Sequence, residues 1–385
     1  MRTRSFFFVS LITVFVMLLG GCAPAAAPQS TAAPAQPTAA PAQPTTAPAQ
    51  PTAAPAQPTT APAASTKPLR IAYIPQNTGN PYFERINSGF QDACKKLGCE
   101  LTFTAPATAD ATAQIPFIQE QVQRGIDVLA IQANSVDALN SIFDDVRKKG
   151  ILVIETNADI SGNESHRDAA VEAVDFTKVG KQMLDRMYDY LGGKGKFAIL
   201  SATTDAPAQK QWIEDPGGVK DLLKNDPKYK DLQLLQVAYG DDVPQKSSTE
   251  AEALLTKYPD MNAIMAPTTV AEAAAAQVVE SAGVYPGGPN AKGKGVIVYG
   301  LGTPNQMRPF IKDGVIKDFD LWDPAKMGTA VVYLAAGLKN GTIKLGEGNT
   351  FDVPGLGKET FGKNNLVTVG SLDTFNKDNI DQFNF

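Results

Sequence analysis

Three aromatic residues, Tyr82, Phe83 and Trp322, stand shortly after apolar segments of the chain. A flat aromatic ring can cover the C–H face of a sugar, while amides and carboxylates can bind its hydroxyl edges. Phe83 could equally pack at the start of a helix, and Tyr82 could lie at the rim of a site. Trp212 falls inside a predicted helix and is expected to pack. The aromatic residues therefore indicate a binding site for a polyhydroxylated ring.

Amide and acid side chains share the same setting, directly after predicted strands. They are Gln76, Asn80, Asn134, Asn157, Asp159, Asp205 and Gln209, and the loop 267–269 adds Pro267 and Thr269. Polar loop residues are often solvated or cap helices, so each of them also has a structural explanation. Asp323 precedes Pro324 and a helical stretch, a pattern typical of an N-cap, so capping and ligand contact are both open there.

Catalytic and cofactor chemistry finds little support in the residue types. The chain has one histidine, His166, in a polar connection typical of the surface. Only Cys94 and Cys99 lie beyond the N-terminal segment, which disfavours a His/Cys zinc centre. The segment 300–305 approaches a dinucleotide-binding motif but lacks its third glycine. We therefore expect no cofactor, no metal and no enzymatic activity. The formal net charge of −5 argues against nucleic acid as a partner.

The first 66 residues predict export and anchoring. Two arginines precede an apolar run that is too short for a stable membrane span, so residues 1–21 are predicted to be a signal peptide. The residues before Cys22 resemble a bacterial lipobox, which implies lipidation of Cys22 and membrane lipid as a partner; an uncleaved anchor helix is the alternative. Residues 23–66 repeat an uncharged Ala/Pro/Thr/Gln unit that cannot form a core and predicts a stalk. The chain is expected on the outer face of the cytoplasmic membrane.

From Lys67 onward, apolar strands alternate with amphipathic helices. Strands are predicted at 69–74, 101–103, 128–132, 152–155, 197–201, 233–238, 263–266 and 296–300, and helices at 83–97, 111–124, 136–149, 178–191, 211–224, 245–257 and 271–281. This alternation predicts parallel sheets wrapped by helices, and a second series after Asp175 predicts a second lobe. The fold class is therefore α/β with two Rossmann-like lobes. Ligands of such sheets bind beyond the carboxyl ends of the strands, where the candidate residues lie.

Several motifs in 67–385 resemble the type I periplasmic binding proteins, and among them the receptors for ribose, rhamnose and autoinducer-2. They are Ile71–Pro75 followed by Asn80–Phe83, then Ala263–Pro267, Gly302–Pro309, Leu321–Asp323 and the ending Asn376–Asp381. The resemblance implies two lobes joined by a three-crossing hinge. Lobe 1 would comprise 67–175 with about 323–350 returning, and lobe 2 would comprise 176–322 with part of 351–385.

The resemblance also implies roles for individual residues. Tyr82 and Phe83 match aromatics that lie against a sugar ring, and Trp322 matches a contact from the third crossing. Gln209 matches a retained amide, and Pro267 a proline whose carbonyl takes part. The autoinducer-2 receptors carry lysine, two aspartates and alanine at the positions of Gln76, Asn157, Ala208 and Thr269. The neutral groups forfeit charge-assisted hydrogen bonds, so these departures favour a neutral pentose or deoxyhexose over the furanosyl signal.

Together these features favour a receptor that closes on a monosaccharide or related polyol and presents it to the permease of an ABC transporter. The protein is expected to be a monomer. A receptor of the same fold for the furanosyl signal is the main alternative. A secreted hydrolase that uses carboxylates such as Asp159 and Asp205 is more remote, because no tuned acid–base pair is visible. The two cysteines at 94 and 99 could form a disulfide in an exported chain, or remain two small buried thiols.

Overall fold

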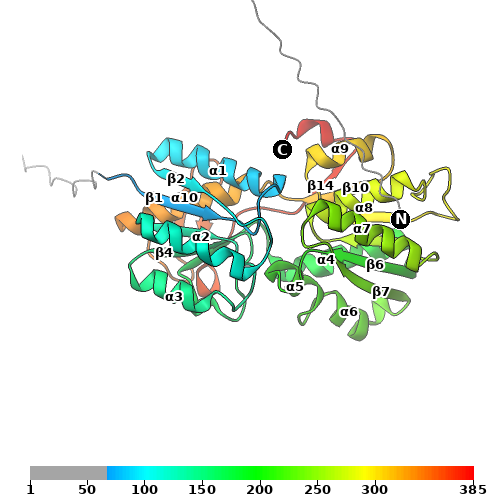
Figure 1. Ribbon diagram of the computed structural model, residues 1–385, viewed down its shortest axis with the longest axis horizontal. Coiled ribbons are helices and arrows are strands. Elements are labelled where there is room, and N and C mark those ends of the chain that lie inside the picture. The colour runs from blue at the N-terminus through cyan, green and yellow to red at the C-terminus, as the bar shows by residue number, and fades with distance from the viewer. Residues whose placement is uncertain (1–66) are drawn as a thin grey trace, which may run out of the picture. The chain divides into compact units, whose positions relative to one another are not determined.

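The structure is a computed structural model that describes residues 67–385. The predicted signal peptide, Cys22 and the predicted stalk lie outside the described residues. Within 67–385, none of the helices combines the length and the hydropathy that a membrane span needs. The described chain folds around two main sheets (Figure 1). We call the six-stranded sheet with its helices lobe 1, and the four-stranded sheet with its helices lobe 2.

The sheet of lobe 1 has the strand order β2-β1-β3-β4-β5-β13, and all neighbours are parallel. Its strands are β1 (Arg70–Ile74), β2 (Glu100–Phe103), β3 (Val128–Ile131), β4 (Leu152–Thr156), β5 (Ala169–Glu172) and β13 (Leu366–Thr368). In β1, Ile71 and Tyr73 enter one buried cluster, while Ala72 and Ile74 enter another. Because both faces of the sheet are buried at its centre, β3 is an unbroken apolar run, and so are residues 71–74 of β1.

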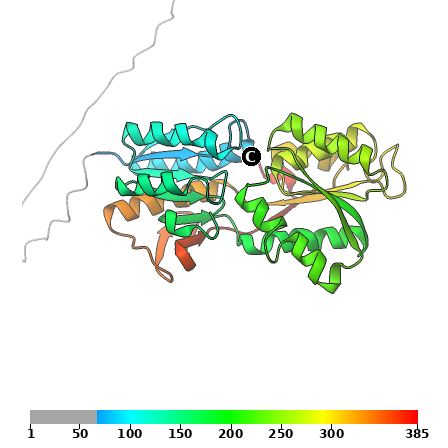
Figure 2. The same ribbon diagram turned by 60° about the horizontal axis from the view of Figure 1, so that its bottom comes forward.

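The two faces of this sheet are covered by different helices (Figures 1 and 2). They are α1 (Pro81–Leu97) and α10 (Ala325–Asn340) on one face, and α2 (Ala111–Arg124) and α3 (Asn140–Lys148) on the other. A Cβ on Gly89 would lie 2.0 Å from the carbonyl oxygen of Ala325, and a Cβ on Gly328 would lie 2.2 Å from that of Ile86. The two glycines therefore allow α1 and α10 to approach closely, and this contact brings the segment before α10 beside the start of α1.

The sheet of lobe 2 has the parallel order β7-β6-β8-β9. Its strands are β6 (Gly195–Ser201), β7 (Leu232–Tyr239), β8 (Ala263–Ala266) and β9 (Ile297–Gly300). A single parallel bridge between Leu301 and Asp320 links it to β10 (Asp318–Leu321), which pairs antiparallel with β14 (Asp373–Asn376). The helices of this lobe are α4 (Phe176–Leu191), α5 (Pro207–Ile213), α6 (Val219–Asn225), α7 (Pro244–Lys257), α8 (Thr269–Ser281) and α9 (Pro304–Lys312).

Three segments connect the lobes: β5 to α4, β10 to α10, and β13 to β14. The second crossing takes the chain into α10, which packs on α1. A small hairpin of β11 (Thr350–Val353) and β12 (Gly357–Thr360) follows before β13 joins the sheet of lobe 1. The segment that returns to lobe 1 thus extends to Thr368, and β14 then pairs in lobe 2.

Two predicted helices differ from the structure, and one strand was not predicted. The helix predicted at 211–224 is two helices, α5 and α6, because Pro216 has no N–H and Gly217 adopts φ 84° between them. The helix predicted from 136 begins at Asn140, since the Ser135 hydroxyl accepts the Ala138 N–H (3.3 Å) and holds a turn there. Strand β5 was not predicted; it has only four residues, and its pairing with β4 and β13 defines it.

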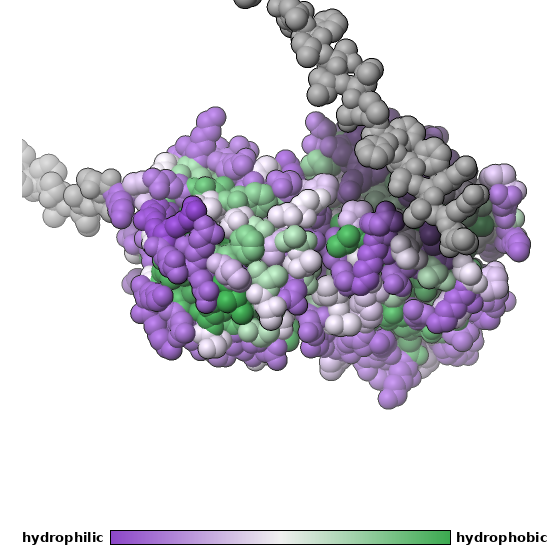
Figure 3. Space-filling model, viewed as in Figure 1, coloured by the Kyte–Doolittle hydropathy of each residue, from purple (hydrophilic) through white to green (hydrophobic). Residues whose placement is uncertain are grey.

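Two further features concern the outside of the lobes. Cys94 and Cys99 are joined by a disulfide that ties the end of α1 to the segment before β2. Hydrophilic residues cover much of the face seen in Figure 3. This is expected for amphipathic helices that place their apolar sides on a sheet.

Candidate functional site

A cavity lies where loops of the two lobes meet. Its lining residues follow strands of both sheets: Gln76 follows β1, Gln132 follows β3, Asn157 follows β4, Asp242 follows β7, Pro267, Thr268 and Thr269 follow β8, Leu301 follows β9, and Trp322 follows β10. Parallel strands expose their carboxyl ends at one edge of a sheet, so this arrangement places the cavity where such sheets bind ligands.

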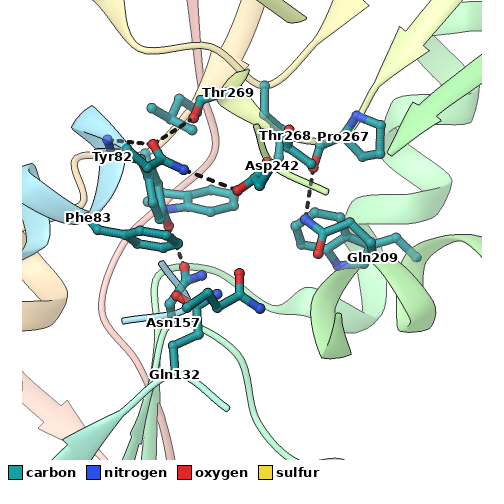
Figure 4. Close-up of a pocket in the computed structure, with 15 residues that line it drawn as sticks. Tyr82, Phe83, Gln132, Asn157, Gln209, Asp242, Pro267, Thr268 and Thr269 are labelled. Atoms are coloured by element: carbon teal, nitrogen blue, oxygen red, sulfur yellow. Dashed lines mark hydrogen bonds between the residues drawn. The ribbon is translucent and has the colours of Figure 1, made fainter. Parts of the chain in front are cut away.

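One side of the cavity consists of residues that already bind one another; we call Tyr82, Asn157 and Trp322 the paired side. The Tyr82 hydroxyl donates to Asn157 Oδ1 and accepts the Trp322 Nε1–H at 2.8 Å (Figure 4). Burial raises the pKa of this hydroxyl well above its usual value, so it remains a donor at neutral pH. The Tyr82 ring meets the Trp322 ring nearly edge-on, with centroids 6.3 Å apart. These contacts fix the orientation of two of the aromatic rings.

Asn80 positions the aromatic pair and joins the two lobes. Its Oδ1 accepts the backbone N–H of Tyr82 at 3.0 Å, which caps α1, and Pro81 occupies the first helical position. Its Nδ2 donates to Asp242 Oδ2 of lobe 2 at 3.1 Å. The same Asn80 amide thus caps α1 and contacts lobe 2. The orientation of Tyr82 and Phe83 at the start of α1 therefore depends on a contact with lobe 2.

Three other lining residues, contributed by both lobes, carry polar atoms that bind nothing within the described residues; we call Gln132, Trp212 and Asp242 the unpaired side. Within residues 67–385, Gln132 Oε1, Trp212 Nε1 and Asp242 Oδ1 are buried and have no hydrogen-bond partner. Most buried polar groups in native proteins are hydrogen-bonded, so three such atoms in one cavity mark groups available to a ligand. Burial raises the pKa of the Asp242 carboxyl to about 6.

Most of the predicted site residues line this cavity. They are Gln76, Asn80, Tyr82, Phe83, Asn157, Gln209, Pro267, Thr269 and Trp322. Gln209 Nε2 donates to the Pro267 carbonyl at 3.0 Å, so this carbonyl already accepts a protein hydrogen bond. Asn157 lies at φ 82°, a left-handed conformation that asparagine tolerates better than most residues. Figure 4 shows Phe83 and Gln132 approaching the cavity opposite Asp242 and Gln209.

Two predicted residues in lobe 1 do not line the cavity and instead support its loops. Asn134 Nδ2 donates to the Gln76 carbonyl at 2.9 Å, which holds the loop after β1. Asp159 accepts two hydrogen bonds from Arg167 in a buried ion pair. Because Arg167 satisfies both carboxylate oxygens, Asp159 is turned away from the cavity.

The acids Asp205 and Asp323 are also outside the cavity. Asp323 forms a two-pronged ion pair with Arg85 at 2.8 Å and accepts the Ala325 N–H at 3.1 Å, so it acts as a helix cap and a lobe-1 contact. Asp205 is exposed to solvent in the loop before α5. Asp159 and Asp205 therefore do not form a carboxylate pair across the cavity.

The sequence interpretation missed six residues that line the cavity. They are Gln132, Trp212, Asp242, Thr268, Leu301 and Leu321. The rule that selects residues after strands also covers Asp242, which lies just beyond β7. Trp212 does pack as expected, with its ring centroid 5.0 Å from that of Phe176, but it also lines the cavity. Gln132 was missed because the strand was predicted to extend over 128–132, whereas β3 ends at Ile131.

The residues present are suited to binding a ring without changing it. Aromatic rings, amides and hydroxyls line the cavity, and Asp242 is its one charged side chain. Among residues 67–385, no group of three His, Cys, Asp or Glu side chains could hold a metal ion. Aromatic faces with convergent amides match the apolar faces and hydroxyl edges of a polyol.

Comparison with known proteins places this architecture in a family. Residues 71–343 match the periplasmic binding protein domain. A sugar ABC transporter structure from Actinomyces odontolyticus is 39% identical, with a TM-score of 0.63 and coverage of 82% of this chain and 98% of that one. An ABC transporter solute-binding protein from Clostridium phytofermentas with bound L-rhamnose is 30% identical, with a TM-score of 0.75 and coverage of 83% and 98%.

A curated relative gives the same result. The ribose import binding protein of Bacillus subtilis is 24% identical over 247 residues, which are 64% of this chain and 74% of that protein. The match to the domain spans most of the described residues, and the two parallel sheets with three crossings agree with it. The chain therefore belongs to the periplasmic binding protein family. It has the type I fold of these solute-binding proteins, which are not enzymes.

Proposed function

We propose that this protein is an extracytoplasmic receptor that captures a neutral monosaccharide, a pentose or deoxyhexose, between its two lobes and delivers it to an ABC permease. The observation that carries the proposal is the composition of the cavity. Three aromatic residues of the predicted set, Tyr82, Phe83 and Trp322, share it with neutral amides, and groups from both lobes contribute. The rhamnose bound by the Clostridium protein and the ribose named for the Bacillus protein support this ligand class.

Binding at this site would be coupled to closure of the lobes. Gln132 reaches the cavity from lobe 1, whereas Trp212 and Asp242 reach it from lobe 2. A ligand that contacts both sets makes all its contacts only when the lobes are closed, so it shifts the equilibrium toward the closed state. A closed receptor offers the permease a surface that differs from that of the open one.

A ligand screen tests the function directly. The purified protein is unfolded and refolded to remove bound ligand, and then screened by thermal shift with pentoses, deoxyhexoses, hexoses, polyols and the furanosyl signal autoinducer-2. Calorimetric titration of the hits should give a Kd in the micromolar range or below for a neutral pentose or deoxyhexose. The furanosyl signal should bind at least tenfold more weakly, because Gln76 and Asn157 supply no charge-assisted hydrogen bonds. Tighter binding of the signal would reverse this ranking.

Closure and anchoring have separate tests. Small-angle scattering should show a monomer whose radius of gyration falls when the identified sugar is added; an unchanged radius at saturation would contradict ligand-driven closure.

For the anchor, we propose that Cys22 is lipidated and holds the receptor on the outer face of the membrane. The wild-type protein should then partition into detergent and the Cys22→Ala variant should not. Equal partitioning of both would exclude lipidation of Cys22.

A further inference from the structure

The electrostatic character of the cavity depends on one carboxylate. Fifteen residues line the cavity, and Asp242 is the only one of them with an ionisable acid or base other than the Tyr82 phenol. Lysine, arginine and histidine are absent from this lining set, so its residues supply no counter-charge to Asp242. The Asp242 side belongs to lobe 2, and the facing groups of lobe 1 are neutral amides and aromatic rings.

The two oxygens of this carboxylate differ in their contacts. Asp242 is 7% exposed, and its Oδ2 accepts the amide N–H of Asn80 at 3.1 Å. The other oxygen, Oδ1, has no hydrogen-bond partner within residues 67–385. The backbone carbonyl of the same residue also lies 3.4 Å from Asn77 Nδ2, so two lobe-1 amides fix its position. A fixed carboxylate with a free oxygen can accept a hydrogen bond but cannot donate one.

From this arrangement we propose that Asp242 selects ligands by charge. It accepts a hydrogen bond from a hydroxyl donor of the bound ring, and it excludes sugars that carry a carboxylate or a phosphate. This inference rests on the proposed function and adds a restriction to it. Two like charges a few ångströms apart repel strongly where water is excluded, and neither amides nor aromatic rings offset that repulsion.

The backbone at this loop permits a clean test. Asp241 and Asp242 both adopt positive φ, 53° and 55°, a conformation that asparagine tolerates. Asp242→Asn therefore removes the charge while keeping shape and backbone. Asp241→Asn is the matched control, because Asp241 lies next in sequence, pairs with Lys246 and does not line the cavity. Asp242→Gly, which also accepts positive φ, serves as a second variant if the first folds poorly.

The two uronate pairs are closely matched in size and differ in charge, whereas the phosphate pair differs in both. The wild-type protein and the variants are first freed of bound ligand by unfolding and refolding. Calorimetry then compares their affinities for D-galacturonate and D-glucuronate with their affinities for the neutral methyl ester of each acid. D-ribose against D-ribose 5-phosphate extends the series to a pentose. We expect the wild type and Asp241→Asn to prefer the neutral member of a pair by about a hundredfold or more. In Asp242→Asn this preference should fall below tenfold, while the neutral sugars themselves bind more weakly.

The outcomes separate this inference from the proposed function. If L-rhamnose, D-ribose and the other neutral sugars all fail to bind, the proposed function fails and this inference with it. If neutral sugars bind but the preference is the same in Asp242→Asn as in the wild type, only the inference is overturned. Rejection of both acid and ester by every protein would show exclusion by size, and the charge proposal would be wrong.

Discussion

The two sides of the cavity differ in what their polar groups already bind. On the paired side, the Tyr82 hydroxyl joins Asn157 and Trp322 in one chain of hydrogen bonds. On the unpaired side, Gln132 and Asp242 each keep a buried oxygen without a partner in the described chain. Groups that are paired before a ligand arrives lose little freedom on binding and set the shape of the site. Groups that are unpaired are where a ligand can make new hydrogen bonds.

The difference extends to what lies behind each side. The loop that carries Asn157 also carries Asp159, which is buried against Arg167. Glu155 and Glu172 are both buried near Asp159, and Glu155 also lies near Arg167. Asp242, by contrast, is held by neutral groups, which are the amides of Asn77 and Asn80 and the side chain of Thr268. The rigidity of the paired side should therefore depend on the buried charged groups around Asp159 and Arg167. The rigidity of the unpaired side should depend instead on the bound ligand.

The largest expected effect is on the support of the paired side. Arg167→Met would leave Asp159 buried without its cation, and loss of one partner of a buried ion pair costs about 3–5 kcal/mol of unfolding free energy. Arg124→Met is the matched control, because Arg124 pairs with Glu120 on the surface and such pairs contribute about 0–1 kcal/mol. Urea unfolding of both variants measures the difference. If the two variants lost similar amounts of unfolding free energy, the buried ion pair would contribute no more to stability than the surface pair.

The next effect concerns the aromatic ring of the paired side. Trp322→Ala should weaken binding of the identified sugar by about 2 kcal/mol or more, roughly thirtyfold, as is typical of a hot-spot residue. Trp322→Phe keeps a ring but loses the N–H that Tyr82 accepts, so its loss should be smaller. Calorimetry on folded variants decides. An unchanged affinity in Trp322→Ala would make this residue part of the packing alone.

A pH effect tests the acids behind the paired side. Burial raises the pKa of Glu172 to about 8 from an ordinary 4.5, so between these values the folded protein holds a proton that the unfolded chain releases. The unfolding free energy should therefore fall as pH rises from about 5 to 8, by at most about 1.4 kcal/mol per pH unit from this group. Glu172→Gln should reduce that slope. Parallel pH profiles of wild type and variant, from denaturant titrations, would contradict the shift.

The smallest effect separates binding from stability on the unpaired side. Gln132→Met removes an oxygen that has no partner, so stability should stay the same while sugar binding weakens by about 1 kcal/mol. Gln114→Met is the contrast: this buried glutamine bonds the carbonyls of Pro75 and Gln132 and the N–H of Asn134. Its loss should lower stability by about 1–3 kcal/mol. If Gln132→Met destabilised the protein equally, the unpaired side would be structural.

Local patterns in the chain were sufficient for much of the fold and part of the site. Gly98, at φ 70°, marks the end of α1, because caps depend on neighbours in sequence, whereas the predicted start at 83 missed the Asn80 cap and Pro81. Apolar runs such as 128–131 predict buried parallel strands for the same reason. The rule that ligands bind after strand ends then selects residues such as Gln76 and Asn157 with no knowledge of the three-dimensional structure.

Long-range partners settle what those patterns leave open. Asn157 and Asp159 are two residues apart on one loop, yet one faces the cavity and the other faces Arg167 of the segment before β5. Asp323 is turned toward Arg85, which is 238 residues away in sequence. The direction of a side chain follows the partner that best compensates its desolvation, and that partner is brought close only when the sheets and crossings have assembled.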